Sequence, residues 1–414
     1  VGDKEQALAT LKQAAEVART IKDTSTRASS LENISSAQVK AGDFKQALEV
    51  ARTIKDGYTK ERVLSGVVSA QAKTEDKEQA LAALKQAAEV AGTIKDASTR
   101  VSSLENISSA LAEAGDFKRA LEVARAIEDA NTKASALSGI ASNLIEAGNK
   151  KQALATLKQA AEVARTIWDA RIKASALSGI ALNLAKAGDK EQALATLKQA
   201  LEVARTIDYA VSRASALSGI APVLAKAGDK EQALATLKQA LEVARAIKNT
   251  PNKESALSGV ASALAKAGDL KQAAEVARTF KNANTKTSAL KQIIRIQNDI
   301  ASAQDKKGDK HQALTTLKKA RGVAQTFENA SAKADALNSI DSAQSDIVSA
   351  RAEDGDFKQA LEVARTIENA NTKAYALSGI SSALAKAGDF KQALEVTHTI
   401  EDASTKANAI GGIA

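Results

Sequence analysis

The same dipeptide recurs along the chain at a restricted set of spacings. Glycine followed by aspartate, or a close variant of this pair, occurs at residues 2–3, 42–43, 75–76, 115–116, 148–149, 188–189, 228–229, 268–269, 308–309, 355–356 and 388–389. Neighbouring copies are 33, 40 or 47 residues apart, so every spacing is 33 plus zero, seven or fourteen. A period of this kind predicts a repeat array in which each unit packs on its neighbours.

Each unit is expected to contain two helices, named A and B in chain order. In the unit that starts at Ala174, apolar residues with the spacing of one helical face mark helix A: Leu177, Ile180, Ala181 and Leu184. Gly188 then occupies the position after the helix that favours a left-handed backbone, and Asp189 is the predicted N-cap of helix B. Gln192 is placed to complete a capping-box-like exchange with Asp189.

Helix B also has one apolar face. In the same unit this face consists of Ala193, Leu197, Ala200, Ala204 and Ile207. A short polar loop follows, with Asp, Asn, Ser or Thr placed to cap the next helix A.

The composition favours an all-α chain with a thin aliphatic core. Among 414 residues there are two prolines, no cysteine and only 2% aromatic residues. Disulfides and thiolate metal sites are therefore excluded, and no apolar run approaches the roughly 18 residues of a membrane span. The compartment stays open between secreted or periplasmic and cytoplasmic. Because the chain contains no methionine, we expect it to be a processed product or a piece of a longer protein.

The charges are balanced and interleaved. Lys and Arg number 58 and Asp and Glu 49, which leaves a net charge of +9 without a basic stripe. This pattern predicts a solvated surface and does not favour a nucleic acid partner.

The two-helix unit resembles the tetratricopeptide repeat family. The residues that match are the apolar positions of helix A, the turn and two small positions of helix B: Leu177, Ile180, Ala181, Leu184, Gly188, Asp189, Ala193 and Ala200. The resemblance covers essentially the whole chain and implies an all-α, right-handed α-solenoid of about eleven helix-turn-helix repeats. It also implies one continuous array over residues 1–414 with an incomplete repeat at each end. The chain departs from the family in its 33-residue unit, in lacking the family's Trp and Tyr of helix A, and in having no Pro that closes helix B.

Some B helices carry seven additional residues, which read LATLKQA in the copy that starts at Asp189. Seven residues are about 1.94 turns and rotate the following residues by only about 20°. The insertion therefore keeps the apolar stripe facing inward. Six B helices are long, five are short, and helix A is lengthened twice, from Thr287 and from Ala334.

The first residue after the capping Asp or Asn varies with helix length. Short B helices have an apolar residue there: Phe44, Phe117, Leu270, Phe357 and Phe390. Long B helices have lysine: Lys4, Lys77, Lys150, Lys190, Lys230 and Lys310. An apolar residue predicts a helix start covered by its neighbours, and lysine predicts a start that projects into water. Three successive long copies from Asn149 are then expected to form a ridge on one edge of the array.

The sequence predicts neither catalytic residues nor a metal or cofactor site. The only histidines, His311 and His398, replace surface-type residues of the repeat and are expected to be solvated. No cysteine nucleophile, Gly-rich phosphate loop after a strand or HExxH pattern is present.

The resemblance implies a concave surface lined by the A helices. The lining positions are serines, with a rim of lysines and one aromatic exception: Ser135, Ser138, Ser142, Ser175, Ser178, Ser215, Ser218, Ser255, Ser258, Ser262, Lys186, Lys226, Lys266 and Tyr375. One interpretation is a polar groove for an extended peptide or an acidic segment. The other is that small residues permit close packing between repeats. Serine occupies the positions of the Lys/Asn clamp with which some family members hold a terminal carboxylate, so that mode of binding is not expected.

Apolar residues replace polar ones in two neighbouring B–A loops. These residues are Trp168 and Ile172, followed one repeat later by Tyr209 and Val211. They form either an exposed contact patch or a partly buried packing cluster. Pro222, inside a helix A, is expected to remove one hydrogen bond and to kink that helix.

These features favour a non-enzymatic scaffold that binds protein or peptide along its concave face. An alternative is head-to-tail self-assembly into a filament or surface layer, because the array has no polar capping helix at either end. A third class is single-stranded RNA binding as in pentatricopeptide-type solenoids. Near-identical serines would give every repeat the same base readout, so this class is less favoured. No membrane partner is expected.

Overall fold

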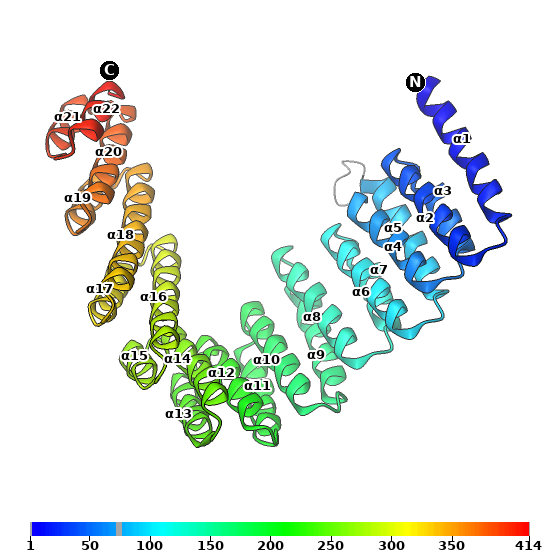
Figure 1. Cartoon of the computed structure of the whole chain (residues 1–414), viewed down its shortest axis with the longest axis horizontal. Coiled ribbons are helices and arrows are strands. Elements are labelled where there is room, and N and C mark those ends of the chain that lie inside the picture. Colours follow the sequence, from blue (N-terminus) through cyan, green and yellow to red (C-terminus); the bar gives the residue numbers. More distant parts are fainter. Residues whose placement is uncertain (1, 72–76, 414) are drawn as a thin grey trace. The chain divides into compact units, whose positions relative to one another are not determined.

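The computed structural model describes residues 2–71 and 77–413, which form 22 helices and no strand (Figure 1). The B helices have odd numbers: α1 (Gly2–Arg19), α3 (Phe44–Thr53), α5 (Lys77–Gly92), α7 (Phe117–Ala126), α9 (Lys150–Arg165), α11 (Lys190–Arg205), α13 (Lys230–Ala246), α15 (Leu270–Arg278), α17 (Lys310–Ala324), α19 (Phe357–Arg365) and α21 (Phe390–His398). The A helices have even numbers: α2 (Thr24–Lys40), α4 (Gly57–Gln71), α6 (Ala97–Glu113), α8 (Ala130–Glu146), α10 (Ala170–Ala187), α12 (Ala210–Ala227), α14 (Thr250–Lys266), α16 (Ala283–Lys306), α18 (Ala330–Glu353), α20 (Ala370–Lys386) and α22 (Ala403–Gly411).

The helices belong to two compact units. Unit 1 comprises Val1–Ile207 with Lys226–Asp229, and unit 2 comprises Asp208–Ala225 with Lys230–Ala414. In unit 1 the successive A helices α2, α4, α6, α8 and α10 pack on one another, and in unit 2 the same holds for α14, α16, α18, α20 and α22. The predicted all-α helical-repeat fold is confirmed, whereas the single continuous array over residues 1–414 stays a prediction. Within the described ranges, no helix has the length and apolar character needed to cross a membrane.

A left-handed glycine and a capping aspartate join helix A to helix B, as predicted. Gly188 has φ +96°, and the N–H of Asp189 donates to the carbonyl of Leu184 at 3.0 Å. The Asp189 carboxylate accepts from the backbone N–H of Gln192 at 3.0 Å. The expected capping-box exchange is wrong, because Leu184 already takes the N–H of Asp189 that the Gln192 side chain would have bound.

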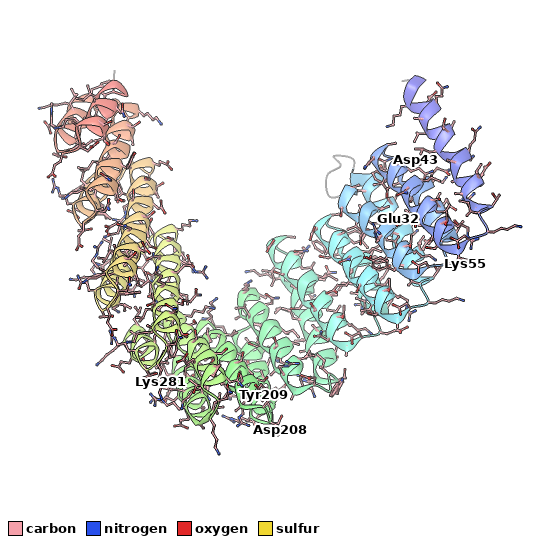
Figure 2. All side chains as sticks on the ribbon, in the orientation of Figure 1. Glu32, Asp43, Lys55, Asp208, Tyr209 and Lys281 are labelled. Carbon is pink, nitrogen blue, oxygen red and sulfur yellow. The ribbon has the colours of Figure 1, made fainter. Side chains whose placement is uncertain are left out.

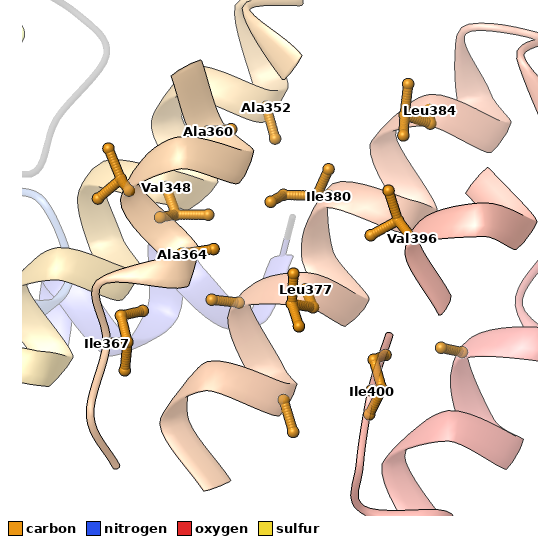
Figure 3. Packing of buried hydrophobic residues seen from close by; sticks show 14 of the residues in the cluster. Val348, Ala352, Ala360, Ala364, Ile367, Leu377, Ile380, Leu384, Val396 and Ile400 are labelled. Carbon is orange, nitrogen blue, oxygen red and sulfur yellow. The ribbon is translucent and has the colours of Figure 1, made fainter. Parts of the chain in front are cut away.

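The predicted apolar faces form the core. Leu177, Ile180 and Leu184 of α10 are buried, and so are Leu197 and Ala200 of α11. Figure 3 shows the equivalent packing in unit 2, where Ile380 of α20 lies between Val348 of α18 and Val396 of α21. Most core residues are Ala, Leu, Ile or Val, which lets neighbouring helices approach closely.

The seven-residue insertions keep their phase, as predicted. Short B helices have 9 or 10 residues and long ones 15 to 18, while α16 and α18 have 24 residues against 17 in α8. Thr196 and Leu197, which lie in the inserted turns of α11, are buried. The insertion thus enlarges the core. The expected ridge would combine α9 and α11 of unit 1 with α13 of unit 2, and it stays a prediction.

The residues at the starts of the B helices mostly follow the expected pattern. Phe44 and Leu270 are buried and Phe117 and Phe357 half-buried, whereas four lysines are exposed: Lys4, Lys150, Lys190 and Lys230. The side chains of Lys77 and Lys310 lie outside the described ones. Phe390 is 53% exposed, so the prediction is wrong there. The reason is that α21 is the last B helix of the described chain, and no later B helix covers its start.

Candidate ligand-binding face of the A helices

A polar cap fixes the N-terminal end of most A helices. In α10 the Asp169 carboxylate accepts from the N–H of Ile172 at 2.9 Å. In unit 1 these caps include Asp23, Asp96 and Asp129, whereas unit 2 uses Asn249, Asn282, Asn329, Asn369 and Asp402. A hydrogen bond from the Thr26 side chain, with a second from its backbone, lowers the pKa of Asp23.

A basic side chain near the start of helix A ties it to the preceding B helix. Nη1 of Arg27 donates to the carbonyl of Ile21 at 2.6 Å, and Nη1 of Arg100 donates to that of Ile94 at 2.6 Å. These carbonyls follow the C-terminal ends of α1 and α5, where a cation is favourable. The prediction from sequence missed this tie. Its signal is a Lys or Arg at the same place in every A helix: Arg27, Lys60, Arg100, Lys133, Lys173, Arg213, Lys253, Lys286, Lys333, Lys373 and Lys406.

The serines expected to line a groove divide into two rows. The row that is exposed consists of Ser135, Ser175, Ser215 and Ser255. The row three residues later is half-buried at Ser138 and Ser258 and buried at Ser178 and Ser218. Ser178 and Ser218 therefore pack between helices, whereas the first row presents its hydroxyl groups on the surface of the A helices.

Ser138 is already bonded to the next repeat. The Nδ2 group of Asn183 on α10 donates to the Oγ of Ser138 at 3.0 Å and to its carbonyl at 3.2 Å. The Ser138 hydroxyl thus helps to join α8 to α10, which is the packing role considered for these serines. Ser142 and Ser262 are half-buried.

The remaining predicted residues of this face are exposed. Lys186, Lys226 and Lys266 lie in the last turns of α10, α12 and α14, where they complement the C-terminal end of the helix dipole. Tyr375, at the position of Ser175, is 70% exposed on α20. Their roles as ligand contacts stay predictions.

A hollow of about 580 Å³ lies between α8 and α10. It is lined on α8 by Ser135, Ser138 and Gly139, and on α10 by Ile172, Ser175 and Gly179. The two glycines leave helix backbone uncovered, and a Cβ at either would meet no atom within 4 Å. Arg171 stands at the rim with its side chain 64% exposed. The hollow thus combines hydroxyl groups, one apolar side chain and one cation.

Hollows recur at the corresponding place in other repeats. One of about 350 Å³ lies between α2 and α4, and one of about 690 Å³ between α14 and α16. Equivalent lysines from the preceding loops, Lys55 and Lys281, line them, and Figure 2 labels both side chains. In the second hollow the Glu254 carboxylate accepts from the N–H of Lys281 at 3.0 Å. The repeats therefore present similar hollows with different charges.

The four apolar loop residues are divided between the two units. In unit 1 Trp168 is 91% exposed and Ile172 is half-buried in the hollow between α8 and α10. In unit 2 Tyr209 is exposed, Val211 is half-buried, and the Tyr209 hydroxyl accepts from Nδ2 of Asn252 at 3.3 Å. Trp168 is thus exposed, as the contact-patch interpretation requires, but a patch that joins all four residues stays a prediction because it would combine two units.

Pro222 lies inside α12, which continues through it. Since proline has no N–H, the carbonyl of Ser218 lacks its helical partner. The kink expected at this point stays a prediction.

His311 and His398 are exposed on α17 and α21, as expected. Within the described residues no three His, Asp or Glu side chains are grouped to hold a metal ion. Lys60 is buried and donates from Nζ to Oγ1 of Thr93 at 3.0 Å, and its burial lowers its pKa. The Lys60 side chain thus bonds to the loop after α5, whereas Arg27 and Arg100 bond to the loop before their own helices.

Comparison with known proteins confirms the tetratricopeptide resemblance. Two family models, both described as tetratricopeptide repeat, match residues 172–246 and 218–286. No relative was found among curated proteins.

Solved structures with some likeness are helical-repeat proteins with low identity. Ton1535 from Thermococcus onnurineus NA1 is 19% identical over 85% of this chain and 99% of that one, with a TM-score of 0.32. A Rap protein complexed with competence and sporulation factor is 15% identical over 93% and 99% of the two chains, with a TM-score of 0.31. The apo form of the quorum sensor NprR from B. thuringiensis is 13% identical over 78% and 99%, with a TM-score of 0.35. None of these likenesses identifies a ligand for this chain.

Proposed function

We propose that this tetratricopeptide-like repeat chain is a non-enzymatic scaffold that binds a segment of another protein along its A helices. The observation that carries the proposal is the hollow between α8 and α10. It brings Ser135 and Ser175, two members of the exposed serine row, together with Ile172 and Arg171. Concave sites with a few convergent polar groups are the usual places for ligands.

The chemistry of this hollow suits an extended peptide with an acidic residue. Ser135 and Ser175 can each donate and accept one hydrogen bond to the amide groups of a peptide backbone. Ile172 offers an apolar contact, and the Arg171 guanidinium offers two parallel donors to a carboxylate. The similar hollows between α2 and α4 and between α14 and α16 would take further residues with different charge requirements.

Selection from a phage-displayed library of random 12-residue peptides tests the proposal. Selected peptides are expected to bind the double variant Ser135→Leu/Ser175→Leu about tenfold more weakly, because two larger side chains without hydroxyl groups would fill the hollow. The matched control is Glu162→Leu, which changes an exposed residue of the B helix α9. Peptides that bind the double variant as tightly as the unchanged protein, or a selection that enriches none, would contradict the proposal.

Head-to-tail self-association is a second candidate. Large apolar side chains are exposed on the outermost helices of both units, at Val17 of α1 and at Phe390, Leu394 and Ile410 of α21 and α22. Size-exclusion chromatography with light scattering over a dilution series tests this candidate. A mass that rises with concentration, and that Phe390→Ser lowers, would support it. A monomer throughout the series would rule it out for this chain.

A further inference from the structure

Arginines at the C-terminal ends of B helices reach across to the next B helix. Nη2 of Arg52 on α3 lies 3.1 Å from the Glu89 carboxylate on α5. Arg125 on α7 donates to Gln159 on α9 at 3.2 Å, and Arg165 on α9 donates to Gln199 on α11 at 3.0 Å. In each case the acceptor belongs to one of two positions of the following helix, a glutamine position or a glutamate position three residues later.

Both acceptor positions are changed where α15 meets α17. Arg278 of α15 corresponds to Arg52, but on α17 Lys319 replaces the glutamine and Gly322 replaces the glutamate. Arg278 therefore meets a second cation and a position without a side chain. Neither Arg278, Lys319 nor the nearby Lys271 forms an ion pair or a side-chain hydrogen bond with any residue in the described ranges.

The same helices also leave an apolar hollow. A groove of about 380 Å³ lies between them, with Lys271, Arg278 and Lys319 among its lining residues. Its apolar lining residues are Leu270, Ala274 and Val323, which are themselves mostly covered. Ala274 stands where every other short B helix has leucine: Leu48, Leu121, Leu361 and Leu394.

The groove has room for an incoming side chain. A Cβ at Gly322 would meet no atom within 4 Å. Asp269 also lines the groove, but its carboxylate accepts from the N–H of Gln272 at 3.0 Å as the cap of α15. Three cations thus border an apolar hollow from which one leucine and one glutamate of the repeat are missing.

We propose that this groove binds an acidic segment of a partner protein, with a carboxylate and a neighbouring aliphatic side chain. The carboxylate takes the place that Glu89 has between α3 and α5, and the aliphatic group fills the space left by Ala274. Charge complementarity selects the acid, and the apolar lining selects a protein segment over a free anion. The site lies on the B helices, so it is separate from the face of the A helices and does not depend on the proposed function.

NMR titration of the ¹⁵N-labelled protein tests the proposal at low ionic strength, where surface charges are least screened. The probe is the capped peptide Gly-Leu-Glu-Glu-Leu-Gly, and the matched neutral peptide has Gln for both Glu residues. The backbone amides of Gly268 and Gly322 are the reporters, because both residues line the groove. Saturable shifts of both amides with the Glu peptide, and only small ones with the Gln peptide, are expected.

Two variants restore the residues that other repeats have at these positions. Lys319→Gln/Gly322→Glu reinstates both acceptors, and Ala274→Leu fills the hollow. Each variant is expected to bind the Glu peptide about tenfold or more weakly, as measured from the shift of the Gly268 amide. Lys318→Gln is the matched control, because it removes one charge from α17 at an exposed position that does not line the groove. It should change the affinity by less than about threefold.

Three outcomes would overturn the proposal. The first is equal shifts with the Glu and Gln peptides, and the second is the absence of saturable shifts at Gly268 and Gly322. The third is competition by inorganic phosphate together with indifference to Ala274→Leu, which would reduce the groove to an anion patch. Circular dichroism of every variant must show unchanged helix content, so that lost binding reports on the groove.

Discussion

The inserted turns of α13 and the lengthened helix α18 both bury polar groups, but these groups find their hydrogen-bond partners in different places. In α13 the insertion buries Thr236 and Leu237, and the Thr236 hydroxyl donates to the carbonyl of Gln232 in its own helix at 2.7 Å. In α18 the corresponding length buries Asp341, Gln344 and Arg351. These polar groups are satisfied by other helices and loops.

The polar contacts of α18 are specific to its neighbours. Asp341 accepts from Nη2 of Arg321 on α17 and from the N–H of Asn369 at 2.9 Å. Arg351 pairs with Asp305 of α16 at 3.2 Å. Buried charges are tolerated only when each is paired and hydrogen-bonded.

The two kinds of insertion also differ in how they bond to neighbouring helices. In α1, α9, α11 and α13 the inserted threonine donates to a carbonyl of its own helix, and α5 has alanine at that position. The exception is α17, where the Thr316 hydroxyl donates to the Gln304 side chain of α16 at 2.9 Å. The two long A helices, α16 and α18, are consecutive and bind each other through Asn298 and Ser339 as well as through Asp305 and Arg351. Most B insertions are therefore self-contained, whereas the two A insertions are bonded to each other.

The largest expected effect comes from breaking the buried pair in α18. Asp341→Ala leaves the Arg321 guanidinium without its buried carboxylate and should lower the free energy of unfolding by about 4 kcal/mol. Urea unfolding followed by circular dichroism measures this loss. The control in the same helix is Asp335→Ala, whose ion pair with Lys291 is exposed and whose loss should cost less than about 1 kcal/mol. Equal effects of the two variants would contradict the distinction between buried and exposed pairs.

An intermediate effect is expected from emptying a B insertion. Leu237→Ala removes a side chain that is 1% exposed in α13 and should lower the free energy of unfolding by about 3 kcal/mol. Leu234, three residues earlier in the same helix, is 40% exposed, and Leu234→Ala should cost less than about 1 kcal/mol. If both variants unfolded at the same urea concentration, the inserted turns would belong to the surface and would not contribute to the core.

The smallest effect is a response to acid that differs between aspartate caps and asparagine caps. Hydrogen bonds from the Thr26 and Thr99 side chains hold the pKa of Asp23 and Asp96 below its ordinary value of 3.8. Each carboxylate thus stabilises its helix above about pH 4, and this contribution is lost as the pH falls through the lowered pKa. The asparagine caps Asn249 and Asn369 have no group that titrates there.

Amide hydrogen exchange measures this response locally. Between about pH 5 and about pH 2.5, protection of the Thr26 and Thr99 amides should fall relative to that of Asn252 and Thr372, after correction for intrinsic rates. The first two amides donate to Asp caps and the last two to Asn caps. A parallel change at all four amides would show that the caps do not cause it.

Local patterns were sufficient to predict most of the fold. Apolar periodicity identified the faces of α10 and α11, and Gly188 and Asp189 identified the turn between them. The phase of a seven-residue insertion follows from helix geometry alone. Asp341 and Arg351 could not be predicted as buried, because a charged residue in a helix is usually exposed and their partners are distant in sequence.

The candidate site was predicted less completely. A shared position in the repeat correctly grouped Ser135 with Ser175, and the structure brings both to one hollow. The burial of Ser178 and Ser218 could not be predicted, because Ser135 and Ser175, which belong to the same predicted set of serines, are exposed. The groove between α15 and α17 was not predicted, because Ala274, Lys319 and Gly322 gain their meaning only from the bonds that Arg52, Arg125 and Arg165 make in other repeats.

Site-specific photo-crosslinking tests the central claim most directly. The photoreactive residue p-benzoylphenylalanine is placed at Ser175, in the hollow of the A helices, or at Glu162 on the exposed surface of α9. With peptides selected on the unchanged protein, the account predicts cross-links from position 175 and none above background from position 162. Cross-links of equal yield from both positions, or from position 162 alone, would contradict a binding face on the A helices.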